Sequence, residues 1–216
     1  MKRFCSALML PVFSLFLVAG CGDKATGPSG SGLSENAGVL DNHAGINTPV
    51  KDSVSAAQVG AMVQEQSMQT VNKIMSVSQG MAKLKASTAS GTIDKTINGT
   101  KSGTATVKGS FSTNQSAGTV HFEALCTFSN YSDDSLIYLG GQMQVNLNMT
   151  FSQTNGDTGD AMSGTCTISG KTKFNGSYVG VNTYSIDFNF ATKAMVYSST
   201  IVSDGVTTTI NLTLKQ

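Results

Sequence analysis

The sequence predicts an α+β fold that is mainly β. One long amphipathic helix is expected to pack on a curved antiparallel meander of about seven to eight strands, which would give a half-barrel or a barrel-like domain. Three observations predict this fold. The spacing of apolar residues changes from near 3.6 to 2 at about Ser87. Turn-forming clusters then recur at hairpin spacing, and no proline follows Pro49 to interrupt a ladder.

The composition indicates a domain whose surface carries few charges. Charged residues make up 12% of the 216-residue chain and hydrophobic residues 39%, and the formal net charge is +1. The polar surface must therefore consist mainly of Ser, Thr, Asn, Gln and Gly. The only arginine is Arg3, so nothing beyond the N-terminus can make bidentate guanidinium contacts to phosphate. No nucleic-acid partner is expected.

The N-terminus has the features of an export signal. Lys2 and Arg3 precede an apolar run from Phe4 to Ala19, which matches the charged n-region and short h-region of a secretory signal peptide. The run is too short to be a good membrane span. It ends in the sequence Leu17-Val18-Ala19-Gly20-Cys21.

This ending resembles the lipobox of the bacterial lipoproteins, which has an aliphatic residue, two small residues and then cysteine. Val18, Ala19, Gly20 and Cys21 match it position for position. The resemblance implies that residues 1–20 are a removed signal peptide and that Cys21 is lipidated on its thiol and acylated on its amino group, with palmitate as a typical acyl chain. Membrane lipid would then be a partner, held through the acylated Cys21. The alternative is an ordinary signal peptide cut after Ala19 or Gly20.

The resemblance also bears on localisation. Gly22 stands where many lipoproteins kept in the inner membrane have Asp, which implies a lipid anchor in the outer membrane of a bacterial cell envelope. Residues 21–48 show no sustained apolar period and are predicted to form a flexible tether with a reach of about 30 Å. His43 in this tether is expected to be solvated. Residues 49–216 are expected to form a single domain.

Residues Val50 to Ala86 are predicted to be helical. Apolar residues recur there at spacings of three and four, which favours one long helix or two shorter ones broken near Gly80. Pro49 is a plausible start, with Asp52 or Ser53 as alternative N-caps. Core packing explains the methionine stripe better than a binding face does. The stripe comprises Met62, Met68, Met75 and Met81.

Strands are predicted wherever apolar residues alternate with polar ones. The clearest run is Ile137 to Ser152, and Asp204-Gly205 between two alternating runs is a strong hairpin signal. Further runs begin at Ala105, Val120, Tyr184, Met195 and Thr208. Turns are expected at Asn98-Gly99, Thr113 to Gly118, Asn130 to Ser135, Asn155 to Asp160 and Asn175-Gly176.

Two cysteines remain in the predicted domain, Cys126 and Cys166, both on the apolar side of their strands. An exported protein meets oxidising conditions, so the sequence predicts that they pair as a disulfide. A plain meander would place the strand containing Val145 between them, and a disulfide needs Cα atoms within about 7 Å. Two buried free thiols are the alternative.

The sequence holds no convergent set of catalytic residues. His121 lies on the polar side of its strand beside Glu123, and His43 lies in the predicted tether. No metal-binding spacing of His and Cys occurs, so no cofactor or metal is expected. The loop from Asn155 to Asp160 offers oxygen donors for calcium, but a solvated hairpin turn explains it as well. An enzyme is therefore not expected.

Two functions fit these features. The first is a non-catalytic binding or structural role at the cell envelope, with an envelope protein or a polysaccharide as partner. The second is a carrier of lipid or another apolar ligand, held between the helix and the concave sheet. Its cavity would be lined by Phe122, Met143, Val145, Leu147, Phe188 and Phe190.

Overall fold

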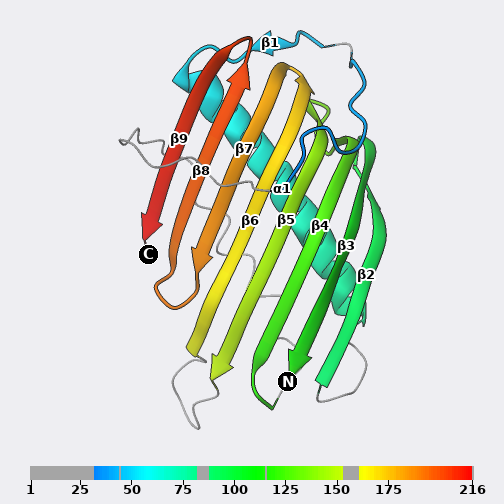
Figure 1. Cartoon of the computed structure of the whole chain (residues 1–216), viewed down its shortest axis with the longest axis vertical. Coiled ribbons are helices and arrows are strands. Elements are labelled where there is room, and N and C mark those ends of the chain that lie inside the picture. Colours follow the sequence, from blue (N-terminus) through cyan, green and yellow to red (C-terminus); the bar gives the residue numbers. More distant parts are fainter. Residues whose placement is uncertain (1–31, 44, 82–87, 115, 153–160, 216) are drawn as a thin grey trace.

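The computed structural model describes residues 32–43, 45–81, 88–114, 116–152 and 161–215, and it confirms the predicted fold class (Figure 1). One helix, α1 (Ser53–Met81), lies against one sheet. The strands are β1 (Thr48–Pro49), β2 (Thr88–Asn98), β3 (Ser102–Asn114), β4 (Thr119–Ser132), β5 (Ile137–Ser152), β6 (Ala161–Gly176), β7 (Tyr178–Asn189), β8 (Ala194–Ser203) and β9 (Val206–Lys215).

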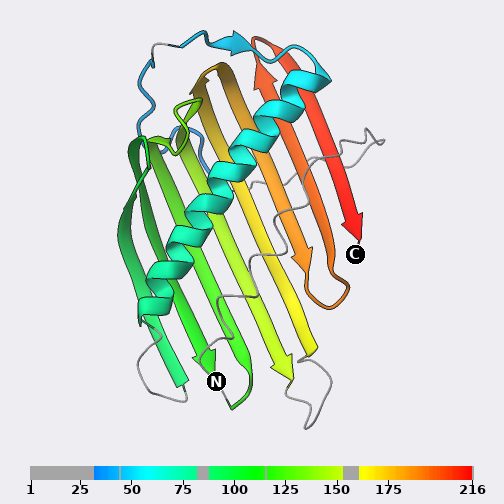
Figure 2. The ribbon, with the colours of Figure 1, turned by 180° about the vertical axis from the view of Figure 1, so that it is seen from behind.

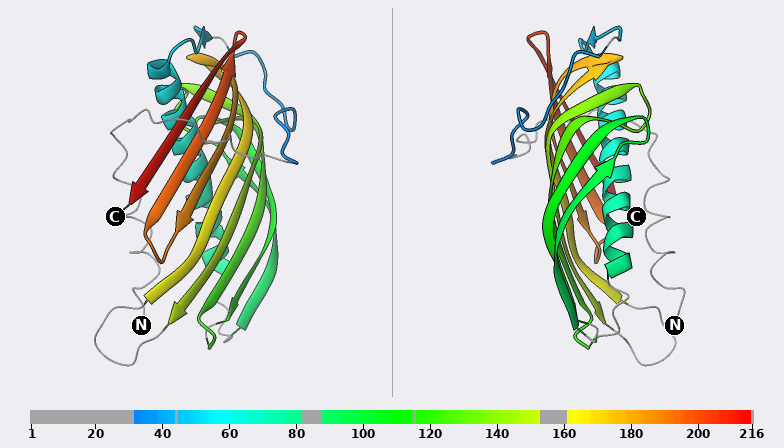
Figure 3. Two further views of the ribbon diagram at one scale, coloured as in Figure 1. Left: turned by 60° about the vertical axis from the view of Figure 1, so that its left-hand side comes forward. Right: turned by 90° about the vertical axis from the view of Figure 1, so that its right-hand side faces the viewer.

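The sheet is a meander that stays open. Strands β2 to β9 pair antiparallel in sequence order, and β1 adds a short parallel pairing with β7. The strand path ends at β2 on one side and at β9 on the other, so the described chain forms a curved half-barrel that does not close (Figure 3). The predicted Asp204-Gly205 turn is confirmed, with φ of 49° and 76° at the two residues, as a two-residue primed turn requires.

Helix α1 begins where one of the proposed caps stands. Asp52 Oδ1 accepts a hydrogen bond of 2.7 Å from the backbone N–H of Ser55, which satisfies one of the unpaired donors of the first turn. The helix then continues through Gly80 to Met81 without the alternative break. The remaining predicted helical residues, 82–86, lie outside the described residues.

The core lies between α1 and the concave face of the sheet, which the helix crosses diagonally (Figure 2). Gly60 lets the helix approach β8 closely, because a Cβ there would lie 3.0 Å from Tyr197 Oη. Alternate strand residues supply the sheet side of the core, as the period of 2 predicts. The helix contributes Ala56, Val59, Val63, Val71 and Ile74, all buried.

Buried polar groups fix the position of α1 on the sheet. Ser67 Oγ donates to Val63 O at 2.7 Å, which leaves it to accept the hydroxyl of Tyr184 at 2.6 Å. Gln66 Nε2 donates to Asp134 Oδ1 and to Ile137 O, each at 3.1 Å. These bonds require one axial position of the helix, since a buried polar group without its partner costs about 1–3 kcal/mol.

An ion pair holds the second half of α1. Lys73 Nζ lies 2.6 Å from Asp133 Oδ1, and Asp133 also accepts the Tyr131 hydroxyl at 2.8 Å and the N–H of Thr100 at 2.7 Å. Burial opposes ionisation of Asp133, but the bonds from Lys73, Thr100 and Tyr131 outweigh it and lower its pKa. Burial likewise opposes the charge on Lys73, and the bonds to Asp133 and Tyr131 nevertheless raise its pKa.

Residues 32–43 and 45–49, called the strap, run over the face of the sheet away from α1, called the outer face below, and end in β1 at the end of the sheet (Figures 1 and 2). Two strap carbonyls accept backbone hydrogen bonds from the sheet at 2.8 Å, Ala37 O from Gly141 and Val39 O from Asn130. The register shifts between Phe128 and Tyr131, and both donor residues have positive φ. This β-bulge turns the N–H groups of Asn130 and Gly141 away from the neighbouring strand, and the carbonyl groups of the strap accept their hydrogen bonds.

Polar side chains and a ring contact complete the attachment of the strap. Glu35 forms a 2.7 Å ion pair with Lys171, and the ring of His43 stacks on Tyr138 with centroids 3.7 Å apart. The prediction of a flexible tether is therefore wrong for residues 32–43 and 45–48, and His43 is half-buried. The tether prediction failed because a segment without apolar periodicity can still be held by hydrogen bonds. Residues 21–31 lie outside the described residues.

Replacing Asp133 should destabilise the domain. We expect Asp133→Asn to lower the free energy of unfolding by about 1–3 kcal/mol, because Lys73 loses its counter-charge. Asp94→Asn, at an exposed position of β2, is the matched control and should change stability by less than about 0.5 kcal/mol. Urea denaturation monitored by circular dichroism measures both. Equal effects of the two variants would contradict the assigned role of the ion pair.

The same pair predicts a pH dependence. The lowered pKa of Asp133 contributes stability above its unfolded value, about 3.9, and this contribution is lost as the pH falls through the folded pKa. The raised pKa of Lys73 contributes stability below about 10.4, which is lost at higher pH. The free energy of unfolding of the Asp133→Asn variant should therefore fall less steeply at acidic pH than that of the wild type. Equal acid dependence in the two proteins would contradict this prediction.

Gly38→Ala should release the strap while leaving the core folded. Gly38 has φ of 71°, and a Cβ there would lie 1.9 Å from Phe128 O, so the backbone must move. We expect faster amide hydrogen exchange at Asn130 and Gly141, with little change at core amides such as Val145. Ile46→Ala is the control, because Ile46 is a strap residue whose side chain is 87% exposed. Unchanged exchange at Asn130 in the Gly38 variant would refute the bonding described.

Candidate functional site

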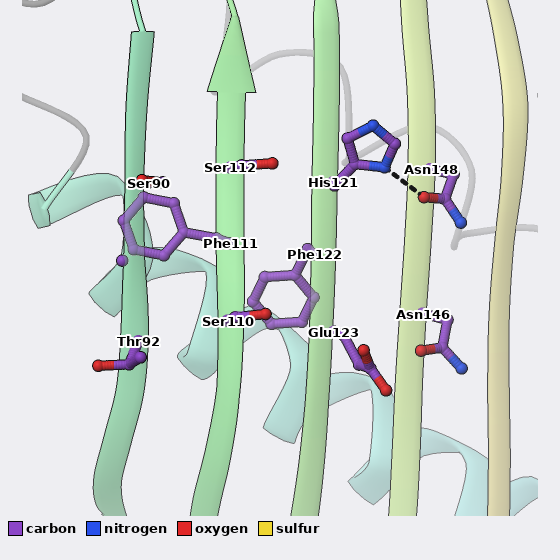
Figure 4. A pocket seen from close by; sticks show the side chains of 11 residues that line it. Ser90, Thr92, Ser110, Phe111, Ser112, His121, Phe122, Glu123, Asn146 and Asn148 are labelled. Atoms are coloured by element: carbon purple, nitrogen blue, oxygen red, sulfur yellow. Dashed lines mark hydrogen bonds between the residues drawn. The ribbon is translucent and has the colours of Figure 1, made fainter.

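The candidate site is an open hollow of about 550 Å³ on the outer face of the sheet (Figure 4). It spans β2, β3, β4 and β5. It lies near the ends of these strands that are opposite to the ends at which the strap contacts β4 and β5. Its lining consists of Ser90, Gly91, Thr92, Ser110, Phe111, Ser112, His121, Phe122, Glu123, Asn146 and Asn148. Its volume falls within the range of small-molecule sites.

Unequal side-chain lengths explain why a β-sheet face is hollowed here. The antiparallel register aligns outer-face residues in rows across the four strands. One row is Ser90, Ser112, His121 and Asn148, and the next is Thr92, Ser110, Glu123 and Asn146. In both rows β2 and β3 supply short hydroxyl side chains, whereas β4 and β5 supply longer ones. The longer side chains therefore form one wall of the hollow.

Two aromatic residues lie beneath the hollow, on the other side of the sheet. Phe111 and Phe122 are paired across β3 and β4, with Phe122 buried and Phe111 half-buried on the helix side of the sheet. The absence of a side chain at Gly91 lets the Phe111 ring lie across β2, because a Cβ there would be 2.9 Å from this ring. Polar side chains therefore surround the hollow, and the sheet backbone separates it from these two rings.

Hydrogen bonds orient the wall of the hollow. His121 Nδ1 lies 2.5 Å from Asn148 Oδ1, across β4 and β5. Because that oxygen is an acceptor, Nδ1 carries the proton of this bond. Glu123 Oε1 accepts the amide of Gln144 at 3.2 Å. The wall therefore presents donors and acceptors in fixed positions, with Glu123 as the only charged residue of the lining.

This arrangement suits binding by neutral hydrogen bonds. Hydroxyl and amide groups donate and accept at once, so they match a ligand rich in hydroxyl groups. No group of three or more His, Cys, Asp or Glu residues positioned to hold a metal ion occurs in the described ranges. The loop considered for calcium, Asn155 to Asp160, lies outside them.

Sequence reasoning located one part of this site. The prediction that His121 is exposed on the polar side of its strand beside Glu123 is confirmed. The hollow itself was not predicted. One signal in the sequence could have indicated it. A short turn pairs Ser110–Ser112 with His121–Glu123, and this pairing places short side chains beside long ones.

The six residues predicted to line an apolar cavity share the concave face, but four of them pack the core. Phe122, Met143, Val145 and Leu147 are 5%, 0%, 2% and 3% exposed, which leaves little room for a ligand beside them. Phe188 and Phe190 are half-buried and meet edge to face with centroids 4.8 Å apart. A further gap beside Ile74 and Ile93 is too small for a water molecule.

The predicted disulfide is wrong in this structure. Cys126 and Cys166 are free thiols, and β5 lies between their strands, with Cys126 opposite Met143 and Cys166 opposite Leu147. Two strand spacings, about 10 Å, separate the cysteines across the sheet, and an offset of four residues adds about 13 Å along the strands, so they lie well beyond the reach of a disulfide. Burial raises the pKa of Cys126 to about 12, and burial together with Asp187 raises that of Cys166 to about 11. Both thiols are therefore unreactive at neutral pH.

Comparison of the chain with family models, curated proteins and solved structures finds no match. In the described part of the chain, no helix combines the length and apolar character needed to cross a membrane. The predicted lipobox with Cys21 lies among residues 1–31, outside the described residues.

Proposed function

We propose that this protein is a bacterial envelope lipoprotein, anchored by acylated Cys21, whose outer sheet face binds a neutral polysaccharide without catalysis. The observation that carries the proposal is the lining of the hollow. Eight of its side chains are hydroxyl, amide, imidazole or carboxylate groups that reach outward from four adjacent strands, and one of these eight is charged. Sugar hydroxyl groups pair with such groups without needing a charged partner.

The strap supports a position close to the membrane. It attaches on the same face as the hollow, where Ser34 N–H donates to Gln142 Oε1 at 3.0 Å. Residues 22–31 are the only ones between Cys21 and the start of the strap, and ten residues can extend no farther than about 35 Å. An anchor on Cys21 would therefore hold the domain within the envelope layer next to the membrane.

The chemistry of the hollow also limits its affinity and its role. Each neutral hydrogen bond contributes about 0.5–1.5 kcal/mol net, so a few such bonds give weak binding. Weak, repeated contacts suit a polymer with many equivalent sites. A catalytic role has less support, because the imidazole of His121 is exposed and its hydrogen-bond partner, Asn148, is a neutral amide.

Removing the amide wall should weaken sugar binding. We expect the double variant Asn146→Ala, Asn148→Ala to bind chitotetraose, a neutral N-acetylglucosamine oligomer, about tenfold more weakly than the wild type. Saturation-transfer NMR on the detergent-solubilised full chain measures the binding. Maltotetraose, tested in parallel, reports which neutral sugars the site accepts.

The control is Thr207→Ala, Thr213→Ala, which removes two exposed outer-face side chains from β9, away from the hollow. It should bind like the wild type. Failure of the wild type to bind either neutral sugar, or equal loss in both double variants, would contradict the polysaccharide proposal.

Cys21→Ala should abolish membrane retention and leave the domain folded. Retention should fail because residues 4–19 are too short for a stable span. Folding should persist because the described core and strap consist of residues that follow Cys21. Cell fractionation with a palmitate-analogue label measures both retention and acylation, and Cys5→Ala is the matched cysteine control. Membrane retention of the Cys21 variant, or a wild type without label, would refute the lipoprotein proposal.

A further inference from the structure

Strand β9 is an unprotected edge of the sheet. It pairs with β8 over its full length, from Val206 to Lys215, and the strand order ends there. In Figure 1 β9 is the last strand on its side of the sheet, and among the described elements only the start of α1 reaches past it, at one end of the strand. An antiparallel edge strand pairs with its neighbour through every second residue, so the other N–H and C=O groups point outward. Such an edge is a template for a further strand.

The other edge, β2, is protected against strand addition. Lys95 stands between Ile93 and Ile97, on the side of the strand that faces the core, and its neighbour Asp94 adds a charge on the outer side. An inward-pointing charge on an edge strand prevents another strand from docking, because docking would desolvate it. Strand β9 has no charged residue from Val206 to Leu214. Charged side chains therefore protect the β2 edge against strand addition, whereas the β9 edge lacks such protection.

The residues of β9 complement a second copy of themselves. Ile210, Leu212 and Leu214 face the concave side and are only half-buried. If two β9 strands meet antiparallel with Asn211 on a two-fold axis, Ile210 lies opposite Leu212 of the other copy and Thr208 lies opposite Leu214. On the outer face Thr209 then lies opposite Thr213. Apolar residues thus lie opposite apolar or threonine residues of the other copy. The two Lys215 side chains lie at opposite ends of the paired strands, so they do not repel each other.

We propose that β9 pairs with β9 of a second copy of this chain, antiparallel about Asn211, so that two sheets join into one. A near-neutral chain with net charge +1 offers little electrostatic repulsion against this association. A two-fold axis perpendicular to the sheet keeps concave face with concave face, as the apolar pairing requires. The pairing depends only on the described edge and does not rest on the function proposed above.

Cysteine cross-linking of the full chain tests the partner and the register together. In purified protein treated with a mild oxidant, Asn211→Cys should form a disulfide-linked species of twice the single-chain mass, because position 211 lies opposite itself. Thr209→Cys alone should not, since position 209 lies opposite 213. Thr209→Cys combined with Thr213→Cys should cross-link again. Wild type controls for the native cysteines, and Thr96→Cys on β2 controls for random collision.

Analytical ultracentrifugation without cross-linking gives an independent measurement of self-association. Asn211→Lys places two like charges opposite each other and should weaken self-association about tenfold, whereas Thr96→Lys should not. Circular dichroism checks that each variant is folded. A monomeric wild type, equal cross-linking at positions 96 and 211, or cross-linking of Asn211→Cys to a protein of different mass would overturn the proposal.

Discussion

The structure depends on covering one apolar face of an open sheet with a single helix. A closed barrel would bury that face by itself, but β2 and β9 remain separate edges here. Helix α1 therefore crosses the concave face diagonally and contacts strands on both halves of the meander. Hydrophobic burial supplies most of the stabilisation and is insensitive to small axial shifts. The bonds of Ser67 with Tyr184 and of Lys73 with Asp133 supply the specificity that burial lacks.

The sequence allowed the elements of the fold to be predicted, but less of their assembly. Regular alternation along Ile137 to Ser152 predicted β5 with its bounds, and Asp204-Gly205 predicted the final hairpin. The strap could not be found in this way. It is held by backbone groups freed at a bulge and by close approaches at Gly38 and Gly45, where a Cβ would lie 1.9 Å and 2.4 Å from carbonyl oxygens. Such attachment has no hydrophobic period to detect.

The candidate site was hidden for a related reason. Alternation assigns Ser110, His121 and Asn146 to the solvent side of their strands, but it does not show which of them are neighbours. Only the strand register shows that short hydroxyl residues of β2 and β3 adjoin longer residues of β4 and β5. The disulfide prediction failed on the same information. The meander order placed β5 between the two cysteines, and the expectation from an oxidising compartment outweighed that geometric objection.

The two proposals fit together through the symmetry of the sheet. A two-fold axis perpendicular to the joined sheet places both helices on one side and both outer faces on the other. The two straps then lie on the same face, which would let the two proposed lipid anchors on Cys21 enter one membrane. The two hollows also share that face. A polymer that contacts both would bind the second hollow at a high effective concentration, which commonly strengthens binding by a factor of about 10²–10⁴ over a single site. A hollow limited to neutral hydrogen bonds is the kind of site that benefits most from such pairing.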